Sequence, residues 1–200
     1  MSSDQDVPIG SVLAIGQCCD VELEMVAGDL STIEADLAIV GVHSPEPIDA
    51  AITDGFEGLN KAMHGAIVRL RSDGIFTGTS GETLFLSSPP APIAAKGVLL
   101  LGLGPTGKSV ASRTRRAIRS AANQAARLSG THAAFAPARL KTGSARFNAA
   151  ASTRAILCGV IDVLAAQPGK LRRWSFVAPP AEAEALANDF RMAFASVWKQ

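Results

Sequence analysis

Two uninterrupted apolar runs of strand length constrain this fold more than any other feature. Residues 37–42 (LAIVGV) and 97–103 (GVLLLGL) contain no charged side chain. A strand with one wet face alternates apolar and polar side chains, whereas a strand buried on both faces is apolar throughout. Both runs therefore predict central strands of a parallel sheet that is covered on both faces.

Helical patterns lie between the strand patterns. The clearest is 109–128, where one side is predicted to be apolar and is formed by Val110, Ala117, Ile118, Ala121, Ala125 and Leu128. We also expect helices over 48–70, with a break near Gly55 or Gly58, and over 148–166 and 181–198. Further strands are expected over 12–15, 21–27, 82–86, 132–137 and 174–178, and the alternation of Glu22 and Glu24 with apolar residues predicts a wet face for the second of these.

This alternation of strands and helices predicts an α/β fold. We expect a three-layer arrangement, in which helices cover both faces of a mixed, mostly parallel sheet. The 200 residues are predicted to form a single domain over 1–200, with 1–20 as an N-terminal extension or an extra strand. That length and a hydrophobic content of 48% are enough for a sizeable core.

Charge divides the chain into two parts. Residues 1–103 hold 14 acids and 4 bases, whereas residues 104–173 hold 13 bases and the single acid Asp162. Such halves bind anions or pair with each other. Five arginines on the outer side of the 109–128 helix form a candidate basic face for nucleic acid, or a solvated helix surface: Arg113, Arg115, Arg116, Arg119 and Arg127.

The remaining composition points to an ordinary intracellular domain. Three cysteines, two of them adjacent, provide no disulfide framework and no zinc spacing, so we expect no metal and no cofactor. The polar, acidic start is unlike a signal peptide, and no apolar stretch approaches the roughly 20 residues that span a bilayer. We expect a cytoplasmic protein without membrane contact.

One segment matches a phosphate-binding pattern. Residues 102–109 (GLGPTGKS) fit G-x-x-x-x-G-K-[ST] after a predicted strand and before a predicted helix. As an alternative function, Gly102, Gly107, Lys108 and Ser109 would serve a nucleotide hydrolase, with Lys108 on the outer phosphates and Ser109 on Mg²⁺. Pro105 removes one amide from the loop, and the only following acid, Asp162, lies inside a helical pattern rather than at a strand end.

Three other segments resemble a macro domain. VAGDLSTIEADLAIVGVHSP (26–45) is similar to the G-D-I-T and D-A-I-V opening of that family. GETLFLSSPPAPIAAKGVLLLGLGP (81–105) is similar to its G-E-A segment and the strand that ends in V-G-P. HAAFAPARLKTGSARF (132–147) is similar to its strand and phosphate loop.

A narrower resemblance covers about residues 20–198. The order G-D-L-S, G-E-T-L-F-L and A-A-K-G-V-L-L-L-G-L-G resembles the N-terminal domain of the M17 leucyl aminopeptidases, which is itself macro-like. In that family a separate domain with two metal ions performs catalysis, and its N-T-D-A-E-G-R signature is not in this sequence. The resemblance implies a non-catalytic domain for assembly, regulation or ligand binding, which associates with itself or with a protein partner.

The resemblance also names candidate ligand residues. Asp29 matches the macro-domain Asp that contacts adenine, and Thr142, Gly143 and Ser144 match the phosphate loop, so ADP-ribose or another nucleotide is a possible ligand. Asp29 could equally cap the turn through Ser31 and Thr32. The stretch that contacts ribose in the hydrolases is replaced by 41–44 (GVHS), where His43 is either a general base or a hydrogen-bonded structural residue.

Overall fold

The computed structural model describes residues 7–44, 54–105, 110–128, 130–137, 149–167 and 169–198. Its strands are β1 (Val12–Cys18), β2 (Val21–Ala27), β3 (Leu37–His43), β4 (Thr83–Ser87), β5 (Gly97–Gly104), β6 (His132–Ala136) and β7 (Arg173–Ala178). The helices are α1 (Asp54–Ala62), α2 (Ala66–Ser72), α3 (Val110–Leu128), α4 (Ala149–Ala166) and α5 (Pro180–Val197), with a 3-10 turn η1 (Leu30–Thr32).

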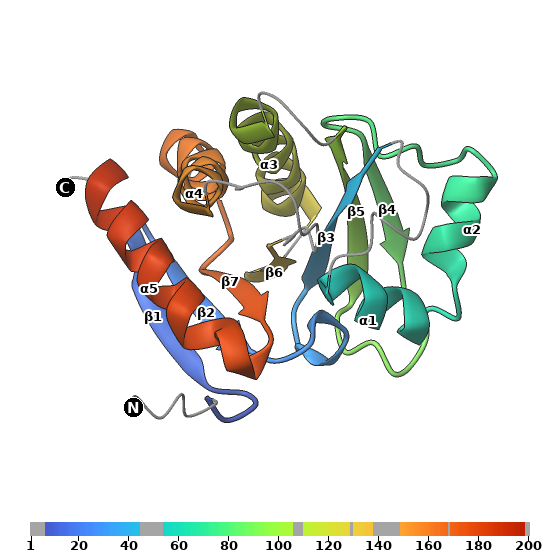
Figure 1. The fold of residues 1–200 in the computed structure, drawn as a ribbon, viewed down its shortest axis with the longest axis horizontal. Helices are drawn as coiled ribbons and strands as arrows, with labels where there is room; N and C mark the ends of the chain where they lie inside the picture. The colour runs from blue at the N-terminus through green and yellow to red at the C-terminus, as the bar shows by residue number, and fades with distance from the viewer. Residues whose placement is uncertain are drawn as a thin grey trace.

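All seven strands form one sheet in the order β1-β2-β7-β6-β3-β5-β4 (Figure 1). The five central strands run parallel, and the two outer strands, β1 and β4, pair antiparallel with their neighbours. The sheet is therefore mixed and mostly parallel, as the sequence predicts.

The sheet separates two apolar cores. On β3, Leu37 and Ile39 pack toward α3, α4 and α5, whereas Ala38 and Val40 pack toward α1 and α2. Alternate side chains of one strand point to opposite faces, so a fully apolar strand supplies both cores at once. This is the physical reason for the uninterrupted apolar runs, and it confirms the three-layer prediction.

The helix predicted over 48–70 is wrong in one detail, the position of its break. The chain stays helical through Gly55 and Gly58 and turns instead at His64 and Gly65, whose φ angles are +52° and +76°. Glycine adopts positive φ at no steric cost. Gly55 and Gly58 serve close packing, because a Cβ on either would overlap the side chain of Ala136 or Asp29.

Two further sequence expectations need correction. Leu128 was expected on the buried side of its helix, but it is 44% exposed because it lies at the last residue of α3. Glu24 was expected on a wet face, but it is 8% exposed, whereas Glu22 on the same strand is exposed. In the described part of the chain, no helix has the length and apolar character needed to cross a membrane.

The β1–β2 hairpin carries two adjacent cysteines at its turn. Cys18 is fully buried, and Cys19 is exposed with a φ angle of +53°. Burial, reinforced by the neighbouring Cys19 thiol, raises the pKa of Cys18 to about 12. Packing against α5 is close here, because a Cβ on Gly16 would overlap the ring of Phe194.

Candidate functional site

The carboxyl ends of the parallel strands meet at one edge of the sheet, where open α/β sheets bind ligands. Strands β2, β7, β6, β3 and β5 end there at Ala27, Ala178, Ala136, His43 and Gly104. Among the predicted site residues, this edge brings together Asp29, His43 and the start of the 102–109 segment. Gly107, Lys108, Ser109, Thr142, Gly143 and Ser144 lie outside the described residues, so the predictions that rest on them stay predictions.

Asp29 is an exposed carboxylate that caps the turn η1. Its Oδ1 accepts hydrogen bonds from Ser31 N (2.8 Å) and Ser31 Oγ (2.6 Å), and its own carbonyl accepts one from Thr32 Oγ1 (3.0 Å). Its other oxygen, Oδ2, faces Gly58 of α1. The capping role expected as one alternative is present, and it occupies one of the two carboxylate oxygens.

His43 joins the ends of two neighbouring strands. Its ring is 3% exposed, and Nδ1 lies 3.0 Å from the carbonyl oxygen of Gly104. Its own carbonyl accepts a hydrogen bond from Arg71 Nη2 at 3.0 Å, and burial lowers the pKa of that guanidinium. Of the two roles considered for His43, these contacts fit the hydrogen-bonded structural residue.

The loop 77–82 occupies the first amides of the phosphate-loop pattern. Gly102 N donates to Glu82 O (2.8 Å) and Gly104 N donates to Gly78 O (2.9 Å), while Pro105 has no N–H. A Cβ on Gly102 would overlap the carbonyl oxygen of Thr79. In residues 102–105 the glycines thus allow a neighbouring loop to approach the strand.

Glu82 organises that loop, a role that the sequence analysis did not assign. Its carboxylate accepts hydrogen bonds from Thr77 Oγ1 (2.7 Å), Thr77 N (3.1 Å) and Thr79 N (3.0 Å). Burial opposes ionisation of Glu82, but the hydrogen bonds from Thr77, Thr79 and the Gly78 backbone outweigh it and lower the pKa. The available signal was the G-E-T match itself.

The basic face of α3 is partly neutralised inside the molecule. Arg115 binds both oxygens of Asp162 on α4 at 2.9 and 2.8 Å, and Arg119 lies 3.8 Å from the same carboxylate. Arg113 donates to Pro105 O at 2.9 Å. Only two of the five, Arg116 and Arg127, are exposed without such a recorded contact, so a uniform basic strip for nucleic acid is weaker than the sequence suggests.

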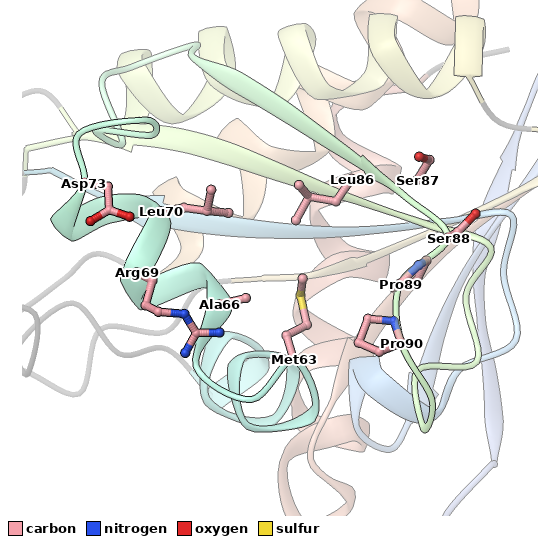
Figure 2. A pocket seen from close by; sticks show the side chains of 10 residues that line it. All are labelled: Met63, Ala66, Arg69, Leu70, Asp73, Leu86, Ser87, Ser88, Pro89 and Pro90. Atoms are coloured by element: carbon pink, nitrogen blue, oxygen red, sulfur yellow. The ribbon is translucent and has the colours of Figure 1, made fainter.

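A cavity of about 450 Å³ lies away from this edge, between α2 and residues 86–90. Figure 2 shows Met63, Leu70 and Leu86 around it, with Pro89 and Pro90 opposite the helix. None of the predicted site residues lines it. Within the described ranges, no group of three or more His, Cys, Asp and Glu side chains is placed to hold a metal ion.

Comparisons with known proteins identify the fold and the family model. The model of the N-terminal domain of the cytosol aminopeptidase family (peptidase M17) matches residues 39–162. No curated protein gives a significant sequence match.

Three solved structures illustrate the similarity. A mutant of the Oceanobacillus iheyensis macrodomain is 14% identical with a TM-score of 0.70, over 96% of this chain and 98% of its own. The Trypanosoma brucei macrodomain in complex with ADP is 18% identical with a TM-score of 0.64, over 88% and 70%. A tomato leucine aminopeptidase mutant is 17% identical with a TM-score of 0.60, over 86% of this chain but only 35% of the tomato chain. At such identities the likeness establishes a macrodomain-like fold.

Proposed function

The chain belongs to the cytosol aminopeptidase family through its N-terminal domain, and from this premise we propose that it is a non-catalytic module for assembly or regulation. The carrying observation is that polar groups at the carboxyl edge are already engaged within the protein. Loop 77–82 uses the amides of Gly102 and Gly104, Ser31 uses one oxygen of Asp29, and Gly104 uses the ring of His43. Groups that are already paired gain little net free energy from a polar ligand.

The partner that fits best is a second copy of the chain or another protein. The acidic part, 1–103, and the basic part, 104–173, are complementary, so they favour contact between copies. Sedimentation at several protein concentrations tests this association, which should weaken as added salt screens the charges. A chain that stays monomeric alone and with candidate M17 partners would contradict the assembly role.

We expect no aminopeptidase activity from this chain. The M17 resemblance assigns peptide hydrolysis to a domain with two metal ions, and the donor groups for such a pair do not occur together in the described residues. The test is release of leucine from a leucyl peptide by the pure protein with Mn²⁺ or Zn²⁺. Metal-dependent turnover that copurifies with the chain would overturn the non-catalytic proposal.

Nucleotide binding is the second candidate, and one observation favours it. Asp29 stays exposed, and Oδ2 receives neither of the two Ser31 hydrogen bonds. Structures of the Oceanobacillus macrodomain are titled with ADPR and with ADP. A carboxylate oxygen is a suitable acceptor for an adenine amino group, so Asp29 is the residue to test.

Thermal unfolding with ADP-ribose, ADP and ATP, each with and without Mg²⁺, separates the candidates. A ligand present at 100 times its dissociation constant adds about 2.7 kcal/mol of stability. The assembly proposal predicts no shift with any of the three. A shift with ADP-ribose that is lost in Asp29→Asn, but kept in the exposed-carboxylate control Asp73→Asn, would establish nucleotide binding instead. A Mg²⁺-dependent shift with ATP that Lys108→Ala abolishes would establish the phosphate loop.

A further inference from the structure

Three buried polar side chains on adjacent strands form a continuous chain. Glu24 of β2 pairs in register with Ser175 of β7, and His132 begins β6 on the other side of β7. Their exposed fractions are 8%, 0% and 8%. Ser175 Oγ lies 2.5 Å from Glu24 Oε1 and 2.7 Å from His132 Nε2, so the hydroxyl joins a carboxyl group to an imidazole.

The backbone fixes the protonation of the imidazole at its other nitrogen. Nε2 faces Ser175, and the imidazole also donates a hydrogen bond to the backbone of Glu34. The nitrogen left for that carbonyl is Nδ1, which must carry a proton to donate. A neutral ring would then have an unprotonated Nε2, which can only accept.

Counting protons across the chain gives one more than usual. A hydroxyl has a single proton, and it can donate either to Glu24 or to His132. With an ionised Glu24 and a neutral His132, one of the two short contacts would join two acceptors. One added proton satisfies both contacts, as Glu–CO₂⁻···H–O···H–N⁺ or as Glu–CO₂H···O–H···N. The two forms interconvert when two protons shift by one position each.

The charged neighbours decide where this proton resides. Arg173 Nε lies 3.9 Å from Glu24 Oε1, Asp36 accepts the amide of His132, and Glu22 is an exposed carboxylate on the same strand as Glu24. Lys96 is paired with Asp36. Burial, followed by the charge of Arg173, lowers the pKa of His132 against the support of the Glu34 backbone and Asp36, so the ring is the less favoured end.

We propose that Glu24, Ser175 and His132 share one proton in the folded state, and that losing this proton at alkaline pH loosens the attachment of β2 to β7 and β6. An unfolded chain holds no such proton above the ordinary histidine pKa of about 6.5. Folding therefore takes up a proton, and the resulting stability is present below that pH and declines as pH rises. An isolated buried neutral histidine has the opposite sign, because its stability declines as pH falls.

Equilibrium unfolding in urea between pH 6.5 and 8.5 tests the proposal. Uptake of one proton makes the unfolding equilibrium constant rise up to about tenfold per pH unit in this range. Glu24→Gln removes the dependence, because the amide can donate to Ser175 without an added proton. Glu22→Gln, an exposed position two residues away, is the matched control and should keep the dependence of the natural chain.

Side-chain NMR of the natural chain gives a readout that no folding defect can obscure. Sharing predicts that the ¹⁵N signals of the His132 ring and the carboxyl ¹³C signal of Glu24 move together with one midpoint. Separate midpoints for the two residues would overturn the proposal. Stability that rises from pH 6.5 to 8.5 in the natural chain relative to Glu24→Gln would also overturn it.

Discussion

At the scale of single residues, several carboxylates of this chain hold the fold together. Asp36, just before β3, accepts hydrogen bonds from Lys96 Nζ (2.6 Å), Thr131 N (2.7 Å) and His132 N (3.1 Å). It thereby joins the starts of two parallel strands to the segment before β5. These contacts, led by the one from Lys96, lower the pKa of Asp36 from 3.8 to about 2.

Replacing Asp36 with Asn should cost about 2 kcal/mol at pH 7, since each pKa unit corresponds to about 1.4 kcal/mol. Because the folded pKa is depressed, the contribution is present above about pH 4 and is lost as pH falls toward 2. Urea unfolding at pH 7 and pH 3 measures the difference between the two proteins. Lys96→Ala, whose side chain is 80% exposed, is the control and should cost less, because the two backbone donors remain. Equal costs for the two substitutions would contradict this account.

Sequence reasoning located some of these residues and missed others for a physical reason. Asp29 could be found because its capping partner, Ser31, lies two positions away. Glu24 was assigned to a wet face because its partner, Ser175, lies 151 positions away along the chain. A local pattern reports on neighbours in sequence, and it holds no record of a hydroxyl that the sheet brings alongside.

At the scale of elements, patterns of burial were the dependable signal. The strand 21–27 has the predicted bounds, and the helices predicted over 109–128 and 148–166 begin within one residue of α3 and α4. The break between α1 and α2 was misplaced because a glycine signals either a turn or a close contact. Gly55 and Gly58 are contact glycines, and Gly65 is the turn.

Close packing between α3 and α4 should matter more than their ion pair. A Cβ on Gly159 of α4 would lie 2.8 Å from Arg115 O and 2.9 Å from Ile118 Cβ, so the helices must separate in Gly159→Ala. Overpacking of this kind costs about 1–3 kcal/mol. Asp162→Asn removes a pair whose side chains are 51% and 26% exposed, and exposed pairs contribute about 1 kcal/mol or less. Thermal unfolding of both variants tests the order, and a larger loss in Asp162→Asn would reverse it.

At the scale of the whole molecule, the two cores should unfold together because the same strands supply both. The tryptophans Trp174 and Trp198 pack in the core under α3, α4 and α5, so fluorescence reports on that side alone. Ile67 of α2 is fully buried in the opposite core, and Ile67→Ala should cost about 2–5 kcal/mol. We expect this substitution to shift the fluorescence transition as much as the circular dichroism transition. A fluorescence midpoint that stays unchanged would show that the two cores unfold independently.

The adjacent cysteines of the outer hairpin make the chain a reporter of its own partial opening. Cys19 lies at the surface and Cys18 beneath it, with its pKa raised to about 12. A thiol reagent should therefore modify Cys19 at once and Cys18 only when β1 leaves the sheet, since the thiolate is the reactive form. The interval between the two modifications, followed by mass spectrometry, measures how often the edge of this domain detaches while its centre stays folded.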